Sequence, residues 1–184
     1  LSEEQRFEKT KIEYDGFGEG ITFISQPIAS ETEITGPMAS KLFVSSETKD
    51  ADLFLVVRVF TEDLKEVTFK GALDPNTPVG QGWLRASHRK LDLEMSKPYR
   101  PYYTHDEIQP LQPNKIYELD VEIWPTSIVI PKDYRIGLTV RGKDYVNQSG
   151  GGSTLPNMNR FSGCGPFLHN DPDDRPMDVF GKKV

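Results

Sequence analysis

The chain has 184 residues, of which 28 are acidic and 22 are basic, so its formal net charge at pH 7 is -6, and 36% of its residues are hydrophobic. This length suits one domain with a core of its own. The excess of acidic residues and the lack of a run rich in lysine and arginine argue against binding to nucleic acid. Because no apolar run approaches the roughly 20 residues that cross a bilayer, we expect no membrane partner.

The N-terminal residues have neither the basic start nor the apolar middle of a signal peptide. The single cysteine, Cys164, cannot form an internal disulfide, which favours a cytoplasmic location. The chain begins with Leu1 and ends within the short stretch MDVFGKKV, so we expect a fragment of a longer protein. Residues 1–20 are interpreted as an N-terminal remnant or linker and residues 21–184 as one domain.

Alternation of apolar and polar residues dominates the chain and predicts strands. In order, the segments are 38–47, 52–62, 65–73 and 81–89, followed by three strands within 115–143. The clearest is KIYELDVEI, in which Tyr117, Leu119, Val121 and Ile123 share one face. Helix content should be low, and strands spaced in this way indicate an all-β sandwich or barrel.

Two further features concern burial and loops. The stretch LFLVVRVF (53–60) is apolar on both faces, so it is either a central strand covered on both sides or a strand with one face against another domain. Residues 92–114 are rich in proline and tyrosine, which predicts a long ordered loop rather than a regular ladder. A second long loop is expected at 147–178, where glycine and acidic turn residues gather.

Three side chains are candidate nucleophiles. Ser87 precedes His88, but neighbouring residues on a strand point to opposite faces and cannot form a dyad. Ser153 lies in GGSTL, which lacks the last glycine of a nucleophile elbow. Cys164 lies between two glycines in FSGCGPF, and the whole chain offers only three histidines as a possible base. We therefore assign no catalytic residue within the chain.

Metal and sugar sites were also considered. His105-Asp106-Glu107 and His169-Asn170-Asp171, the latter with Asp173 and Asp174, hold metal-ligating residue types but have neither the D-x-[DN]-x-[DN]-G loop nor H-E-x-x-H spacing, so we expect neither a metal nor another cofactor. Aromatic residues that could stack on sugar rings keep open an independent carbohydrate-binding module as the alternative function. These are Trp83, Tyr99, Tyr102, Tyr103 and Trp124.

Several segments, in this order, resemble one family. They are ITGPMASKLFVSSETKDADLFLVVRVF, GQGWLRASHRKLD, PYRPYYTHDE, YELDVEIWPTSIVIPKDYRIGLTVRGKDY and GPFLHNDPDDRP. Together they resemble the C-terminal non-catalytic domain of the X-prolyl dipeptidyl peptidase and cocaine-esterase group of serine hydrolases. The resemblance implies a jelly-roll β-sandwich of the galactose-binding-domain-like kind.

The resemblance also implies a partner. An α/β-hydrolase catalytic domain would precede this domain and supply the Ser-Asp-His triad, none of which maps onto this chain. Such parents cleave ester or amide bonds through an acyl-enzyme, and the C-terminal domain steadies the catalytic domain and helps to form the wall of its cleft. This chain alone should not be an enzyme. Family members continue past Val184 with further strand residues, and a missing last strand would leave an edge open to homo-oligomer formation.

The segment 81–89 is expected to position the interface with that partner. As a strand, it would carry Trp83, Arg85 and Ser87 on one face and His88 on the other, with Arg85 or Arg89 pairing with a carboxylate. The residues predicted to contact the catalytic domain or shape its cleft are Trp83, Arg85, His88, Arg89, Tyr99, Tyr102 and His105.

Overall fold

The computed structural model describes residues 20–70 and 77–143. In this part of the chain, every regular element except one short 3-10 helix is a strand. The elements are β1 (Ile21–Ile24), β2 (Thr32–Val44), β3 (Asp52–Phe60), β4 (Glu66–Val67), β5 (Gly80–Arg85), the 3-10 helix η2 (Ala86–His88), β6 (Tyr117–Ile130) and β7 (Arg135–Arg141). The predictions at 147–178, Ser153, Cys164 and His169 lie outside the described residues.

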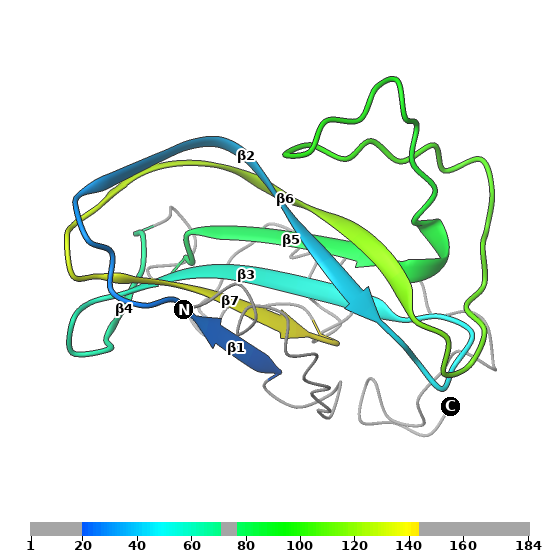
Figure 1. Ribbon diagram of the computed structural model, residues 1–184, viewed down its shortest axis with the longest axis horizontal. Helices are drawn as coiled ribbons and strands as arrows, with labels where there is room; N and C mark the ends of the chain where they lie inside the picture. Colours follow the sequence, from blue (N-terminus) through cyan, green and yellow to red (C-terminus); the bar gives the residue numbers. More distant parts are fainter. Residues whose placement is uncertain (1–19, 71–76, 144–184) are drawn as a thin grey trace, which may run out of the picture.

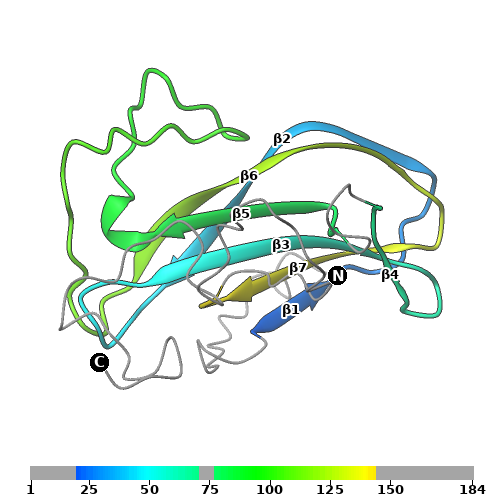
Figure 2. The same ribbon diagram turned by 180° about the vertical axis from the view of Figure 1, so that it is seen from behind.

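Two antiparallel sheets form the domain. In the five-stranded sheet, β3 pairs with β7 on one side, β7 pairs with β1, and the other side of β3 pairs with both β5 and β4. The second sheet is a long ribbon of β2 and β6 that curls over the first, as Figures 1 and 2 show from opposite sides. The predicted all-β sandwich is therefore confirmed.

The β2–β6 ribbon contains one bulge. Gly36 pairs with Thr126 and Met38 with Ile123, so Pro37 lies opposite both Trp124 and Pro125. Proline has no N–H for a ladder, and a bulge is a place where a strand tolerates it. Two separate strands were predicted on either side of Pro125, but β6 continues through it, because the bulge absorbs the missing hydrogen bond.

The core lies between the sheets. Leu53, Leu55, Val57 and Val59 alternate along β3 and face the buried side chains of β6, among them Leu119, Val121 and Ile123. The opposite face of β3 is also covered, since Phe54 and Val56 are each only 2% exposed. Of the two interpretations of the doubly apolar stretch, the structure supports a central strand buried on both sides.

The two sheets come into backbone contact where β6 crosses β5. A Cβ atom added to Gly82 would lie 2.0 Å from the backbone oxygen of Glu122, which leaves no room for any side chain. A Cβ atom added to Gly80, two residues earlier on the same face, would lie 3.1 Å from the Met38 side chain and 3.3 Å from that of Ile123, with the nearest backbone atom, the oxygen of Trp124, at 3.7 Å. Glycine at position 82 thus allows β6 to lie directly on the five-stranded sheet.

Three predicted strand boundaries were wrong. The segment 81–89 is a strand only to Arg85, after which Ala86, Ser87 and His88 form η2. Of the segment 65–73, the described residues form a strand only at Glu66–Val67, and the strand predicted to begin at residue 38 begins at Thr32. In each case pairing with a neighbour fixed the ends, which local alternation does not reveal. No helix in the described ranges has the length and apolarity to cross a membrane.

Candidate functional site

A polar corner holds the start of β3 to the end of β5. The register pairs Asp52 with Arg85, and the guanidinium donates two hydrogen bonds to that carboxylate, from Nε at 2.7 Å and from Nη2 at 2.9 Å. Their side chains are only 9% and 15% exposed. This two-pronged geometry is the strong form of an arginine–carboxylate pair. The sequence-based prediction that Arg85 pairs with a carboxylate is correct.

The same register continues beyond the ends of the strands. The backbone N–H of Ala86 donates to the carbonyl of Ala51 at 2.8 Å, and this brings Asp50 opposite Ser87. The Asp50 carboxylate accepts hydrogen bonds from the backbone N–H of Ser87 at 2.9 Å, from the Ser87 hydroxyl and from the N–H of Ala51. We call Asp50, Asp52, Arg85 and Ser87 the corner.

The hydrogen bonds of the corner show that Ser87 and His88 do not form a catalytic dyad. The buried Ser87 hydroxyl donates to Asp50, while the ring of His88 meets His105. Ser87 is therefore a structural donor with a carboxylate partner and not a nucleophile facing an imidazole base. The sequence argument placed both residues on a strand, whereas they lie on η2; the separation of their side chains now rests on their observed partners.

Arg89 anchors the long segment that follows. One of its Nη atoms donates to the carbonyls of Ala86 at 3.0 Å and Gln109 at 2.5 Å, and its guanidinium lies 4.5 Å from the centre of the Tyr117 ring. It thus binds carbonyls and an aromatic face rather than the carboxylate considered as its partner. The segment 89–116, which we call the tyrosine loop, leaves and returns at the corner (Figure 1).

Tyr103 ties the middle of the tyrosine loop to β6. Its hydroxyl donates to the carbonyl of Asp120 at 2.5 Å and accepts from the N–H of Glu122 at 3.2 Å. Burial raises the pKa of the Tyr103 hydroxyl to about 12, because the phenolate would lose its hydration there. Tyr103 was one of the candidates for sugar stacking, and the structure shows it as an anchor of the loop.

The outer part of the tyrosine loop is held by its own hydrogen bonds. The N–H of Asp92 donates to the carbonyl of Tyr102 at 2.9 Å, and Lys97 and Arg100 exchange two backbone hydrogen bonds. Lys90 pairs with Asp106 at 3.0 Å and with Glu107 at 3.2 Å. Hydrogen bonds to these carboxylates raise the pKa of Lys90. These bonds confirm that the segment is an ordered loop without a regular ladder.

Apolar side chains of this ordered loop face solvent. Leu93 is 85% exposed and Tyr99 is 56% exposed, and Met95 and Tyr102 are also exposed. We call these four residues the loop apolar set. Exposed apolar side chains on a well-bonded loop are typical of an interaction site, since a protein gains nothing by ordering them in water.

His88 and His105 approach each other at the base of the loop. Their Nδ1 atoms lie 3.5 Å apart and their ring centres 5.7 Å apart, and the Tyr103 ring lies 5.9 Å from that of His105. Asp106 is occupied by the hydroxyl of Thr104 and by Lys90. In the described ranges, no group of three or more histidine, cysteine or acidic side chains converges as a metal site.

Trp83 and Trp124 form a separate aromatic pair at the crossing of β5 and β6. Their ring centres are 4.9 Å apart and their planes are inclined by 59°. Such a tilted pair is a packing arrangement and does not offer two coplanar faces to a sugar ring. Trp83 thus packs against Trp124 of β6.

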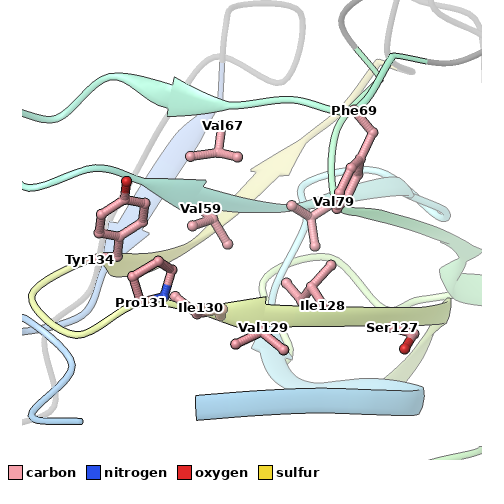
Figure 3. A pocket seen from close by; sticks show the side chains of 10 residues that line it. All are labelled: Val59, Val67, Phe69, Val79, Ser127, Ile128, Val129, Ile130, Pro131 and Tyr134. Atoms are coloured by element: carbon pink, nitrogen blue, oxygen red, sulfur yellow. The ribbon is translucent and has the colours of Figure 1, made fainter. Parts of the chain in front are cut away.

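An apolar cavity of about 270 Å³ opens near the end of β6. Figure 3 shows Val59, Val67, Val79 and Ile128 around it, and Tyr134 and Phe69 stand on either side. Its lining brings together no nucleophile with a base and no pair of carboxylates. Of the groups described, the corner with its tyrosine loop is the better candidate for function.

The chain was compared with known proteins. The family model described as "X-Pro dipeptidyl-peptidase C-terminal non-catalytic domain" matches residues 12–162. Putative serine esterases of Mycobacterium bovis and Mycobacterium tuberculosis are each 32% identical to this chain over 132 residues, which is 67% of this chain and 19% of those proteins.

The solved structures agree with this match. A CocE/NonD family hydrolase from Staphylococcus aureus superposes with a TM-score of 0.66 at 29% identity, over 69% of this chain and 23% of that one. An archaeal aminopeptidase, with a TM-score of 0.50 at 14% identity over 70% of this chain and 19% of that one, shares the fold. The chain thus spans about a fifth of the proteins it matches, 19% of the esterases and 23% of the staphylococcal hydrolase. It belongs to the family of X-Pro dipeptidyl-peptidase C-terminal non-catalytic domains.

Proposed function

We propose that this domain is the C-terminal part of a longer serine hydrolase, in which it packs against an α/β-hydrolase catalytic domain and stabilises it. The family match over residues 12–162 carries this proposal, because that family is named as non-catalytic and C-terminal. The chain's 19% share of the matched esterases leaves ample length for a catalytic domain.

The tyrosine loop is the proposed docking element. It is held at its base by Arg89 and Tyr103, and it presents the loop apolar set to solvent. An ordered loop loses little conformational entropy when a partner covers it, which favours binding. Contact with the catalytic domain would bury Leu93 and Tyr99, and the loop would then form part of the wall of the active-site cleft.

The catalytic chemistry is assigned to the parent protein. A serine of the catalytic domain would attack an ester or amide carbonyl, form an acyl-enzyme and release it by hydrolysis. This domain supplies no member of the triad in that scheme. The contribution of this domain would be structural, because a docked loop fixes one side of the cleft and limits the entry of water and substrate.

The upstream coding sequence is the first test. We expect a G-x-S-x-G motif between a strand and a helix in the preceding part of the gene. The 184-residue chain alone should leave p-nitrophenyl acetate unhydrolysed, while the longer protein should cleave it and lose activity after labelling by a fluorophosphonate. An open reading frame that begins at this domain would refute the proposal, as would ester hydrolysis by the chain alone.

A further inference from the structure

We propose that His88 and His105 form a two-histidine site for a divalent transition-metal ion such as Zn²⁺, Co²⁺ or Ni²⁺. The two Nδ1 atoms face each other at 3.5 Å, although the residues are 17 positions apart in the sequence. Imidazole nitrogen is a preferred ligand of these ions and a poor ligand of Mg²⁺ and Ca²⁺. The sequence argument against a metal considered only neighbouring residues, and this pair joins two segments.

The distance between the two nitrogens matches the distance between two nitrogen ligands of one metal ion. Zinc–nitrogen bonds of about 2.0–2.1 Å at a tetrahedral centre place two ligating nitrogens roughly 3.4 Å apart. The observed 3.5 Å is close to that value. A bound ion would take the place of any proton shared between the two Nδ1 atoms, and that proton would move to Nε2 or leave to solvent.

Both histidines lie on segments that hydrogen bonds hold in place. His88 lies on η2, which the bond of Ser87 to Asp50 fixes, and the carbonyl of Ser87 accepts a hydrogen bond from the N–H of Gln109 at 2.8 Å. His105 adopts a left-handed backbone with φ of 52°, in a turn held by the bond of the Thr104 N–H to the carbonyl of Lys90. The ligands are therefore positioned before any metal arrives, which lowers the entropic cost of binding.

The site is open to solvent. His105 is exposed and His88 half-buried, so an ion can enter without unfolding. The nearby carboxylates of Asp106 and Glu107 are engaged by Lys90, so water would complete the coordination of the ion in this chain. A bound ion would link His88 on η2 to His105 in the tyrosine loop. It would therefore hold the base of the loop more firmly.

The test uses the untagged 184-residue chain, because a histidine tag would itself bind metal. Co²⁺ titration followed by visible absorption and Zn²⁺ titration calorimetry should both show one saturable site per chain, unaffected by excess Mg²⁺. Either His88→Gln or His105→Gln should weaken binding by about tenfold or more, since each removes one of two ligands. His169→Gln removes the third histidine of the chain and is the matched control; it should leave binding unchanged.

Circular dichroism on each variant separates loss of a ligand from loss of the fold, and His105→Gln changes an exposed side chain that the fold should tolerate. Zn²⁺ should also raise the melting temperature of the wild-type chain and not that of folded His105→Gln. The proposal is overturned if no saturable binding occurs, if binding persists in both ligand variants, or if it is lost in His169→Gln.

Discussion

The corner and the loop apolar set are neighbours in the chain but meet opposite surroundings. In the corner, polar groups are buried or half-buried and each has a partner, with Arg85 against Asp52 and Ser87 against Asp50. A few residues later, Leu93 and Tyr99 are apolar and exposed. Buried matched polar groups specify how a domain folds, whereas ordered exposed apolar groups have no role within it. The contrast separates what this domain needs to fold from what it offers to a partner.

The largest expected effect on stability is at the crossing of β5 and β6. Gly82→Ala should lower the free energy of unfolding by about 3 kcal/mol or more, because its Cβ would collide with the backbone of Glu122. Gly80→Ala is the matched control on the same face, where side chains can yield, and it should cost clearly less. Urea denaturation of the two variants measures the difference, and equal costs would contradict the close crossing.

Breaking the corner should have the next largest effect. Asp52→Ala removes two hydrogen bonds between a carboxylate and the little-exposed Arg85 guanidinium, so we expect a loss of about 2–3 kcal/mol in unfolding free energy. Lys41 pairs with Glu118 and Asp120 on the surface, and Lys41→Ala is the control for a pair of exposed charges; it should cost clearly less than Asp52→Ala. Similar losses in both variants would remove the distinction between the corner and the surface.

Removing the anchor of the loop should have a smaller effect, and one that depends on pH. Tyr103→Phe loses two hydrogen bonds to β6 and should cost about 1–2 kcal/mol at neutral pH. A phenol whose folded-state pKa is about 12, above its usual value near 10, keeps its contribution below pH 10 and loses it as pH rises through about 12.

The wild-type chain should therefore lose stability more steeply than Tyr103→Phe between pH 10 and pH 12. Urea midpoints measured across that interval provide the comparison. Parallel curves for the two proteins would show that Tyr103 is not buried as described.

The smallest effect on stability is expected in the loop apolar set. The double variant Leu93→Ser/Tyr99→Ser should change the unfolding free energy of the 184-residue chain by less than about 0.5 kcal/mol, because both side chains are already in water. Thermal unfolding of the isolated chain checks this. A large loss would mean that these residues support the domain itself, and the proposed division between corner and loop would fail.

The sequence predicted the fold class because alternation is a local property. It also predicted the ordered loop rich in proline, and it left two interpretations of the apolar stretch around Leu55 and Val56, of which the structure supports the strand covered on both sides. It could not predict where β5 ends, since the pairing of Asp52 with Arg85 is set by register between segments far apart in the chain. Asp50 and Asp52 were missed as partners for the same reason, although DAD opposite RAS becomes a recognisable pattern once the register is known.

The contact between His88 and His105 could not be predicted from the sequence for a similar reason. Each was proposed as an interface residue, but only the return of the tyrosine loop to η2 brings the two rings together. Trp83 was grouped with the loop residues because it is close to them in sequence, and it packs instead on Trp124. Fold class follows from local patterns, whereas the composition of a site depends on which distant segments meet.

The central claim is that the loop apolar set serves a partner and not the domain. The most direct measurement is the melting temperature of the catalytic domain in the longer protein, with and without Leu93→Ser/Tyr99→Ser. The account predicts a clear drop for the variant in the longer protein, although the same change leaves the 184-residue chain unaffected. An unchanged melting temperature in both proteins would contradict it.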